Sequence, residues 1–262
     1  MEYKVEDIIE ILIEFAPLEL AMENDNCGLI LGDMQSEVAG ILTCLDVTNE
    51  VVQEAICNGA NLIISHHPLI FYPQKSFDNS AYESSIFLEC ARCNINIVAM
   101  HTNLDACDGG INDYLAHKLG LENIQGKGFF RKGNLSQSES FSEFEKRAQK
   151  VFADKKARVI LPKNNIVKRV AVASGSGGRD DEMIEELKNE NIDVLITGEV
   201  KHSIALKLAF YGIGLIEIGH YYTEICSKKI IAKLLAEKLK HPDYINGRFV
   251  SESQKEKSPF EQ

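Results

Sequence analysis

The sequence predicts an α/β fold made of two similar lobes with mostly parallel, mixed sheets. Three observations support this prediction. Apolar runs typical of strands alternate with segments of helical periodicity, the same order of elements occurs twice along the chain, and residue usage (45% hydrophobic, 26% charged) is that of a globular protein. Strand–helix–strand alternation favours parallel strands with helices on the faces of the sheet. A chain of 262 residues can bury a substantial core around such sheets.

The first half of the chain carries clear helix and strand signals. Apolar residues recur at helical spacing over 5–15, and Pro17 stops this helix. A second helix is expected at 49–58, with Thr48 as its N-cap and Gly59 after its last residue. The remaining predicted elements of this half are strands at 38–47, 62–65 and 95–100 and helices at 81–92 and 111–119.

The second half repeats this alternation. It opens with a helix at 143–152, where Ser142 and Glu145 form a capping-box pattern. The elements that follow are strands at 158–161, 169–173, 194–197 and 215–218 and helices at 181–189, 203–211 and 223–240.

The repeat is also visible in the residues themselves. Residues 54–65 align with 186–197, and His101-Thr-Asn-Leu-Asp105 aligns with His220-Tyr-Tyr-Thr-Glu224. We therefore predict a duplicated α/β unit of about 110 residues. The first repeat is expected at 1–125, the second at 141–262, and the polar, Gly/Ser-rich stretch 126–140 as the connection between them. The last dozen residues have the composition of a solvated tail.

Charge and cysteine content narrow the function classes. The formal net charge of −11 argues against direct binding to a nucleic-acid backbone, which requires a basic surface. No run of residues has the roughly 18 uncharged apolar positions that a membrane span needs. Seven scattered cysteines, an odd number, suggest reduced thiols and a cytoplasmic location.

Histidines gather at the ends of predicted strands. Open α/β sheets bind ligands beyond the carboxyl ends of their strands, and five of the seven histidines fall there or just after. These five are His66, His67, His101, His202 and His220. A single histidine in such a place is more often an ordinary hydrogen-bonded residue. The combination of His66-His67 with two histidines that each precede an acidic residue by four positions favours metal binding instead.

The spacing of these residues suits two neighbouring divalent ions. His66 and His67 are adjacent and can turn toward different ions at a strand end, while Asp105 supplies a further oxygen ligand. His220 and Glu224 share one helix face, and the two carboxylate oxygens of Glu224 can bridge a pair of ions. Imidazole and carboxylate ligands without thiolate suit Zn, Fe, Mn, Co or Ni.

Two other signals are weaker. The turn Ser174-Gly-Ser-Gly-Gly178 follows a strand and could cradle a phosphate with its backbone N–H groups, but it lacks the rest of a known phosphate motif, so a plain tight turn is favoured. Cys107 lies near Asp105, and a small buried thiol is the favoured interpretation there.

These motifs resemble those of the Nif-three-like dinuclear metal-centre family, whose members are often called GTP cyclohydrolase I type 2 homologs. The resemblance covers nearly the whole chain, although Asn24 stands where the family usually has Trp. The motifs that carry it are Asp25-Asn-Cys-Gly-Leu29, Ser65-His-His-Pro68, His101-Thr-Asn-Leu-Asp105, Thr197-Gly-Glu-Val-Lys-His202 and Gly219-His-Tyr-Tyr-Thr-Glu224.

The resemblance implies two intertwined α/β lobes of the short family form and a ring of six chains. It assigns one metal ion to His67 and Asp105 and the other to His66 and His220, with Glu224 touching both. The internal repeat makes His101 the counterpart of His220, but the family pattern leaves His101 outside the ligand set. We therefore expect His101 to act in catalysis as a proton carrier beside the metals.

Two classes of function follow. The first is a metal-dependent hydrolase that acts on a nucleotide, either by opening the guanine ring of GTP or by phosphoester hydrolysis. The polar residues beyond the ligands, His101, Asn103, Glu199 and His202, favour this class. The alternative is a non-enzymatic protein for metal storage, delivery or regulation. No evident guanine-binding element occurs in the sequence, which is the observation that keeps this alternative open.

Overall fold

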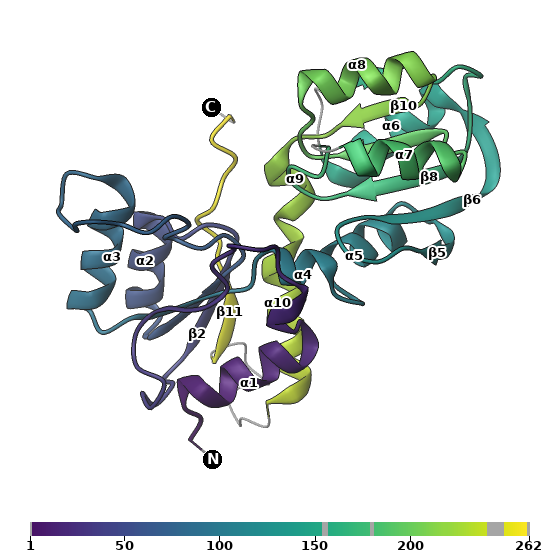
Figure 1. The fold of residues 1–262 in the computed structure, drawn as a ribbon. Helices are drawn as coiled ribbons and strands as arrows, with labels where there is room; N and C mark the ends of the chain where they lie inside the picture. The colour runs from purple at the N-terminus through teal and green to yellow at the C-terminus, as the bar shows by residue number, and fades with distance from the viewer. Residues whose placement is uncertain (1, 154–156, 179–180, 240–248, 261–262) are drawn as a thin grey trace. The chain divides into compact units, whose positions relative to one another are not determined.

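The chain folds into two compact units, drawn as ribbons in Figure 1. The computed structural model describes residues 2–153, 157–178, 181–239 and 249–260. The first unit combines two separate segments, Met1–Cys107 and Ile225–Gln262, whereas the second unit is the continuous segment Asp108–Glu224. The chain therefore passes between the units twice.

The first unit is built on a sheet whose described strands follow the order β1-β4-β3-β2-β11. Strands β2, β3, β4 and β11 are parallel, and β1 runs antiparallel to β4 at one edge. The three inner strands are buried along their whole length, as expected for parallel strands covered on both faces. The strands are β1 (Gly28–Leu31), β2 (Ile41–Cys44), β3 (Leu62–Ser65), β4 (Asn96–Ala99) and β11 (Val250–Glu252).

Helices cover both faces of this sheet, as Figure 1 shows. On one face Leu42, Ile63 and Ile97 of the strands pack with Val51 of α2 and Ile86 of α3. Helix α10 packs against β2 and β3 on the other face, together with α1. The helices of this unit are α1 (Val5–Phe15), the short 3-10 helix η1 (Leu18–Leu20), α2 (Asn49–Cys57), α3 (Tyr82–Arg92), α4 (Thr102–Ala106) and α10 (Cys226–Lys238).

The second unit has its own mixed sheet, with the described strands in the order β5-β6-β8-β9-β10-β7. Strands β8, β9 and β10 are parallel and central, and β5, β6 and β7 pair antiparallel toward the edges. The strands are β5 (Glu122–Gln125), β6 (Arg131–Ser140), β7 (Arg158–Ile160), β8 (Ile166–Ala173), β9 (Val194–Thr197) and β10 (Gly214–Glu217).

Helices again lie on both faces of the sheet. Ile184 of α7 and Leu208 of α8 join Ala171, Leu195 and Leu215 of the strands in one buried cluster. Helices α5 and α6 pack against β6 and β8. The helices of this unit are α5 (Ile111–Lys118), α6 (Phe141–Phe152), α7 (Asp181–Asn189), α8 (His202–Tyr211) and α9 (His220–Glu224).

The two units share one order of elements. In the first unit β2, α2, β3, α3, β4 and α4 follow one another, and in the second β8, α7, β9, α8, β10 and α9 do the same. Each series places three parallel strands side by side and ends in a five-residue helix. This observation confirms the predicted α/β fold with mixed, mostly parallel sheets. The internal duplication as an origin of the two units stays a prediction.

The unit boundaries differ from the predicted halves, which divided the chain into 1–125 and 141–262. Residues 108–125 belong to the second unit, and the segment after Glu224 returns to the first. The stretch 126–140 is more than a connection, because 131–140 forms β6 and pairs with both β5 and β8. Its polar residues form a strand because partner strands satisfy the backbone on both sides.

Local predictions also needed correction at three places. The capping box of α6 uses Ser140 and Glu143, two residues before the predicted pair, so the helix begins at Phe141. The last predicted helix is divided into α9 and α10, and its expected end at residue 240 lies outside the described residues. The predicted solvated tail is wrong for 251–256, because β11 pairs with β2 and Glu256 accepts hydrogen bonds from Leu45 and Asp46.

None of the helices in the described part of the chain combines the length and apolar character that a bilayer crossing requires.

Candidate metal centre

His66 and His67 extend β3 beyond the carboxyl end of the first unit's sheet. Their backbone N–H groups donate to Cys44 O at 3.1 Å and to Leu45 O at 2.9 Å, which continues the pairing with the β2 chain. The His66 side chain is fully buried, while His67 is partly exposed. The predicted strand-end position of both residues is therefore correct.

Three histidine rings of this unit are oriented in the same way. Nδ1 of His66 lies 2.8 Å from Met100 O, Nδ1 of His67 lies 2.7 Å from Asp46 Oδ1, and Nδ1 of His101 lies 2.7 Å from Asp25 Oδ1. A carbonyl and a carboxylate only accept hydrogen bonds, so Nδ1 carries the proton in each ring. Nε2 is then the nitrogen that can bind a metal ion. This is the usual way in which proteins orient histidine ligands.

Asp25 fixes His101 from a buried position. Its carboxylate accepts hydrogen bonds from the His101 ring, from the Thr102 hydroxyl and from the Thr102 backbone N–H at 3.1 Å. Burial raises the pKa of Asp25, but the bonds from His101 and Thr102 outweigh it and hold that pKa well below its usual range. Asp25 therefore stays ionised and keeps the proton of His101 on Nδ1.

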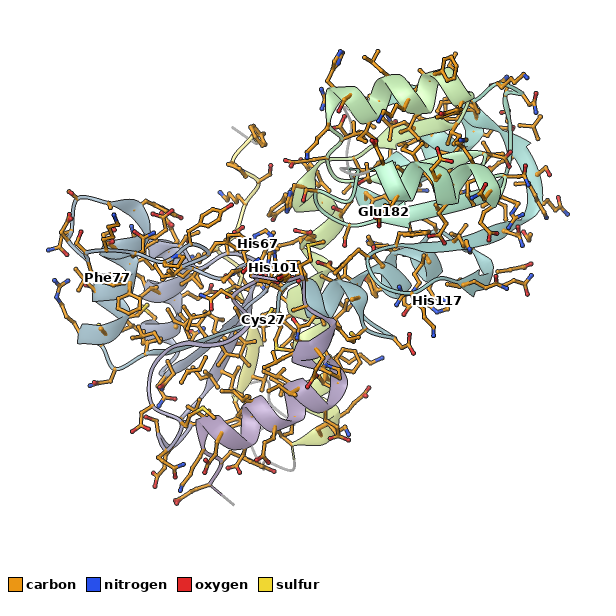
Figure 2. All side chains as sticks on the ribbon, viewed as in Figure 1. Cys27, His67, Phe77, His101, His117 and Glu182 are labelled. Atoms are coloured by element: carbon orange, nitrogen blue, oxygen red, sulfur yellow. The ribbon has the colours of Figure 1, made fainter. Side chains whose placement is uncertain are left out.

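These side chains converge at one place in the first unit. His66, His67 and His101 each offer a ring nitrogen within 4.8 Å of the others, and the labels of His67 and His101 lie together in Figure 2. Oδ2 of Asp105, on α4, lies 3.9 Å from Nε2 of His66. That separation is too long for a hydrogen bond. It is shorter than the sum of two metal–ligand bonds of about 2.0–2.2 Å each, so one ion can contact both atoms. The donor set therefore fits a divalent metal ion.

His220 and Glu224 form a compact pair on α9 of the second unit. Nε2 of His220 lies 2.7 Å from Oε2 of Glu224, one helical turn away, and its Nδ1 lies 3.4 Å from Oε2 of Glu199. Glu224 is almost fully buried, whereas the His220 side chain is about a third exposed. An imidazole and a buried carboxylate on one helix face are again donors that suit a divalent ion.

The turn after β8 leaves space for the Glu224 carboxylate. Gly175 has a φ of +52°, and a Cβ added there would lie 1.8 Å from Oε1 of Glu224, so the carboxylate occupies the space that any other residue would need. The N–H groups of this turn are engaged: Gly175 donates to Thr223 Oγ1, Gly177 to Ser174 O and Gly178 to Glu199 O. This pattern fits the tight turn rather than a phosphate cradle.

The other polar residues singled out in the sequence have different surroundings. The Asn103 amide is buried and donates to Ala16 O at 2.7 Å, so its role is structural. His202 is exposed at the start of α8 and belongs to none of the possible metal-binding groups among the described residues. Cys107 is buried, with its thiol 3.6 Å from Leu104 O, as predicted.

Two residues that orient the histidines were not predicted. Asp46 lies two residues after the end of β2, and the strand-end rule applied to β2 would have found it. Asp25 precedes β1 in a segment without a strand signal, and only its place in the Asp25-Asn-Cys-Gly-Leu29 motif pointed to it. The resemblance pairs Asp105 with His67, while the structure shows its carboxylate near His66.

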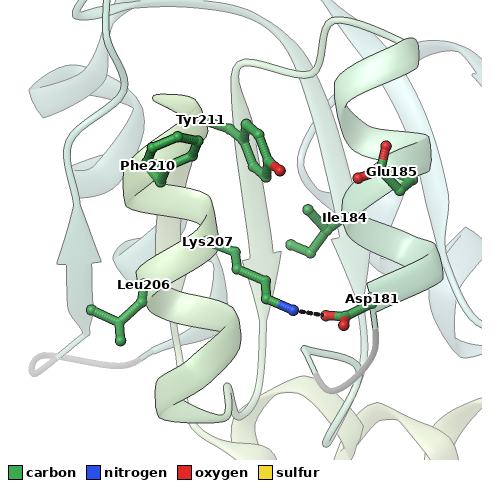
Figure 3. Close-up of a pocket in the computed structure, with 7 residues that line it drawn as sticks. All are labelled: Asp181, Ile184, Glu185, Leu206, Lys207, Phe210 and Tyr211. Atoms are coloured by element: carbon green, nitrogen blue, oxygen red, sulfur yellow. Dashed lines mark hydrogen bonds and ion pairs between the residues drawn. The ribbon is translucent and has the colours of Figure 1, made fainter.

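A groove between α7 and α8 of the second unit differs from the candidate metal centre in the residues that line it (Figure 3). Its lining combines apolar side chains, among them Ile184, Leu206 and Phe210, with an ion pair between Lys207 and Asp181. None of its lining residues is a histidine, so the groove offers no imidazole ligand and does not belong to the candidate metal centre.

The sequence is similar to proteins of known families. The family model for Duf34/NIF3 (NGG1p interacting factor 3) matches residues 3–257. A GTP cyclohydrolase 1 type 2 homolog of Lactococcus lactis is 31% identical over 264 residues, which cover 98% of each chain. The GTP cyclohydrolase 1 type 2 of Helicobacter pylori is 32% identical over 234 residues, 88% of this chain and 91% of that protein.

Solved structures agree with this result. The Staphylococcus aureus protein SA1388 matches with a TM-score of 0.87 and 28% identity over 99% of both chains. Reduced HcgD from Methanocaldococcus jannaschii matches with a TM-score of 0.77 and 30% identity over 91% of this chain and 96% of that one. Because the family model spans nearly the whole sequence and these relatives cover it almost end to end, the chain belongs to the Duf34/NIF3 family.

Proposed function

We propose that this protein holds two divalent metal ions and hydrolyses a nucleotide. The observation that carries the proposal is the common orientation of His66, His67 and His101, each with Nδ1 against an oxygen acceptor and Nε2 available as the ligand nitrogen. An ordinary buried histidine needs no such convergence with two other imidazoles and a carboxylate.

The proposed ligands are those that the sequence predicted: His66, His67 and Asp105 from the first unit and His220 and Glu224 from the second. Asp105 lies just before the first crossing between the units, at Cys107, and Glu224 is the last residue before the chain returns.

Hydrogen bonds within the first unit connect the start of α10 to the segment after β2. Lys228, near the start of α10, accepts a hydrogen bond from Thr43 Oγ1 through its carbonyl and places Nζ 3.3 Å from Glu256. Oε1 of Glu256 in turn accepts from the N–H groups of Leu45 and Asp46, and Asp46 orients His67. The start of α10 is therefore linked through Glu256 to the segment that orients His67.

The types of ligand atom in the site restrict which metals can bind. The thiol of Cys27 lies beside the carboxylate that orients His101, with its Sγ 3.3 Å from Asp25 Oδ2. Burial raises the pKa of Cys27 to about 12, so at neutral pH it is a thiol and not a thiolate ligand. Imidazole and carboxylate alone suit Zn, Fe, Mn, Co or Ni.

When bound, two such ions would polarise the substrate and lower the pKa of a water nucleophile. The chain's own residues orient the reaction. Asp25 holds the proton of His101 on Nδ1, and Nε2 of His101 then takes up or returns a proton at the substrate. The names of the Lactococcus and Helicobacter relatives support GTP or a related nucleotide as the substrate, with ring opening or phosphoester hydrolysis as the reaction.

One observation also favours the non-enzymatic alternative. The side chains of His67 and His220 are 24% and 32% exposed, which would allow ions to exchange with a partner. A fully loaded wild-type protein that hydrolyses neither GTP nor model phosphoesters would support storage or delivery of metal.

The test measures metal content and turnover on the same samples. We expect close to two ions per wild-type chain, and Glu224→Ala should lose both ions and all turnover, since it removes the bridging carboxylate. Glu237→Ala, an exposed carboxylate on α10 that pairs with Lys233, is the matched control and should retain both. Full occupancy in Glu224→Ala would overturn the ligand assignment.

We further propose a cytoplasmic homohexamer. The resemblance to the family is the support for the ring of six chains. Light scattering at micromolar concentration should give six times the mass of one chain, and the mass of a single chain would contradict the proposal.

A further inference from the structure

Two exposed aromatic rings lie beside the histidine cluster of the first unit. The loop that follows Ser65-His-His-Pro68 carries Phe71 and Tyr72, whose side chains are 40% and 73% exposed. The Phe71 ring meets the His101 ring edge-on, with centroids 5.8 Å apart at 90°. The Tyr72 ring meets Phe71 at 4.8 Å and 86°. Two perpendicular rings therefore form a corner next to His101.

The loop is anchored to the same segment that orients His101. The Asn26 side-chain amide donates to Ile70 O at 2.5 Å, and the neighbouring Asp25 accepts from the His101 ring. Leu69 and Ile70, directly before the aromatic pair, are buried in the core. Phe71 is therefore positioned relative to His101 by three adjacent attachments, which distinguishes it from a surface aromatic on a loosely held loop.

We infer that Phe71 and Tyr72 form a seat for a planar heteroaromatic ring, such as the base of a nucleotide. Aromatic side chains bind planar rings by offset stacking and edge contacts, and both geometries are offered by two perpendicular rings. Stacking depends on apolar contact and not on charge, so the net charge of −11 does not oppose it. The assignment of this ring to a substrate rests on the proposed function.

The seat supplies what the sequence did not reveal, namely a place for a base beside the histidines. A ring held against Phe71 would lie next to His101, the residue proposed to move a proton. The contacts of this seat are not specific for guanine, because every base presents a π face. It therefore predicts a preference for nucleosides over phosphates without a base, and not a choice among bases.

The loop contains a matched control. Phe77 is 42% exposed, close to the value for Phe71, but it stacks on Phe87 with ring centroids 4.6 Å apart. Figure 2 shows Phe77 well away from His67 and His101. Replacing Phe77 by Leu removes an equally exposed ring from the same loop without touching the proposed seat.

The experiment measures binding of guanosine and of tripolyphosphate to the metal-loaded protein by equilibrium dialysis. We expect guanosine to bind the wild type, Tyr72→Phe and Phe77→Leu alike, and to bind Phe71→Leu and Tyr72→Leu roughly 5- to 150-fold more weakly, the range for loss of one stacked base contact. Tripolyphosphate should bind all five proteins equally. Thermal melting of each variant checks that the fold is retained.

Other outcomes would overturn the inference. These are guanosine affinity that is unchanged in Tyr72→Leu and Phe71→Leu, equal losses for guanosine and tripolyphosphate, or no guanosine binding to the wild type. The readout is independent of turnover. Ring-dependent guanosine binding without any hydrolysis would leave the seat intact and contradict the proposed hydrolase, whereas hydrolysis with an unchanged KM in Tyr72→Leu would contradict the seat alone.

Discussion

The short helices α4 and α9 occupy corresponding places in the two units and make different contacts there. Each follows the third of three parallel strands, and each joins a histidine to an acidic residue four positions later. In the first unit the His101 ring donates a hydrogen bond to Asp25, and the carboxylate of Asp105 lies near His66. Both side chains therefore contact segments outside α4. In the second unit His220 and Glu224 lie 2.7 Å from each other.

Histidines at equivalent positions of the two units therefore need not have equivalent roles. His101 has a carboxylate next to Nδ1, that of Asp25 at 2.7 Å. Nδ1 of His220 lies 3.4 Å from the more exposed carboxylate of Glu199. His67, a proposed ligand, has the same carboxylate contact at Nδ1, so the proposal that His101 carries a proton rests on the family pattern, which leaves His101 outside the ligand set.

The largest expected effect separates the two histidines directly. His101→Ala should keep its metal content and lower turnover of the nucleotide by roughly 10²–10⁴-fold, as for the loss of a general acid or base. His220→Ala should instead lose one of the two ions. Elemental analysis and turnover of the same preparations check both. If His101→Ala loses metal as His220→Ala does, the two helices contribute ligands alike and the contrast drawn above is wrong.

A smaller effect is expected from the carboxylates behind the rings. Asp46→Asn weakens the bond that orients His67 at 2.7 Å and should reduce metal affinity by about 10–100-fold, the usual cost of such a change. Glu199→Gln should cost less, because Glu199 is 56% exposed and lies 3.4 Å from His220. Calorimetric titration of the metal-free proteins compares them. Equal losses would mean that both units hold their histidines equally firmly.

The smallest effect is expected from replacing Gly175, the glycine next to the Glu224 carboxylate. Gly175→Ala combines a left-handed backbone with a clash against the carboxylate and should lower the free energy of unfolding by about 1–3 kcal/mol. Gly120→Ala has the same backbone penalty, with φ +70° and no atom within 4 Å of the added Cβ, and should cost about 1 kcal/mol. Urea denaturation measures both costs. Metal content should fall only in Gly175→Ala, and unchanged metal there would show that the turn does not position Glu224.

Much of the fold was predictable because the inner strands are short apolar runs between clear turn residues. The predicted limits of β3, β9 and α7 agree with the structure residue by residue. The strands β5, β6 and β11 were missed, since they contain polar residues and become strands only through their partners. Pairing of this kind is a tertiary property that a local pattern does not carry.

The residues of the candidate site likewise fall into two groups, those that a local sequence pattern predicts and those that only tertiary contacts identify. The strand-end rule brought His66, His67 and Asp105 to attention, and the structure places them close together in one unit; their role as metal ligands stays a prediction. Asp25 could not be found by local pattern, because its partner His101 is 76 residues away. The aromatic pair Phe71 and Tyr72 was passed over for the same reason, since its significance lies in the contact with His101.

The discontinuity of the first unit has a consequence for synthesis on the ribosome. Asp108–Glu224 is complete as soon as it has emerged, and its strands can pair without the rest of the chain. The first unit must wait for α10, for β11 and for Glu256, which holds the N–H groups of Leu45 and Asp46 beside His67. The surroundings of His67 are therefore complete only after Glu256 has emerged, later than the whole of the second unit.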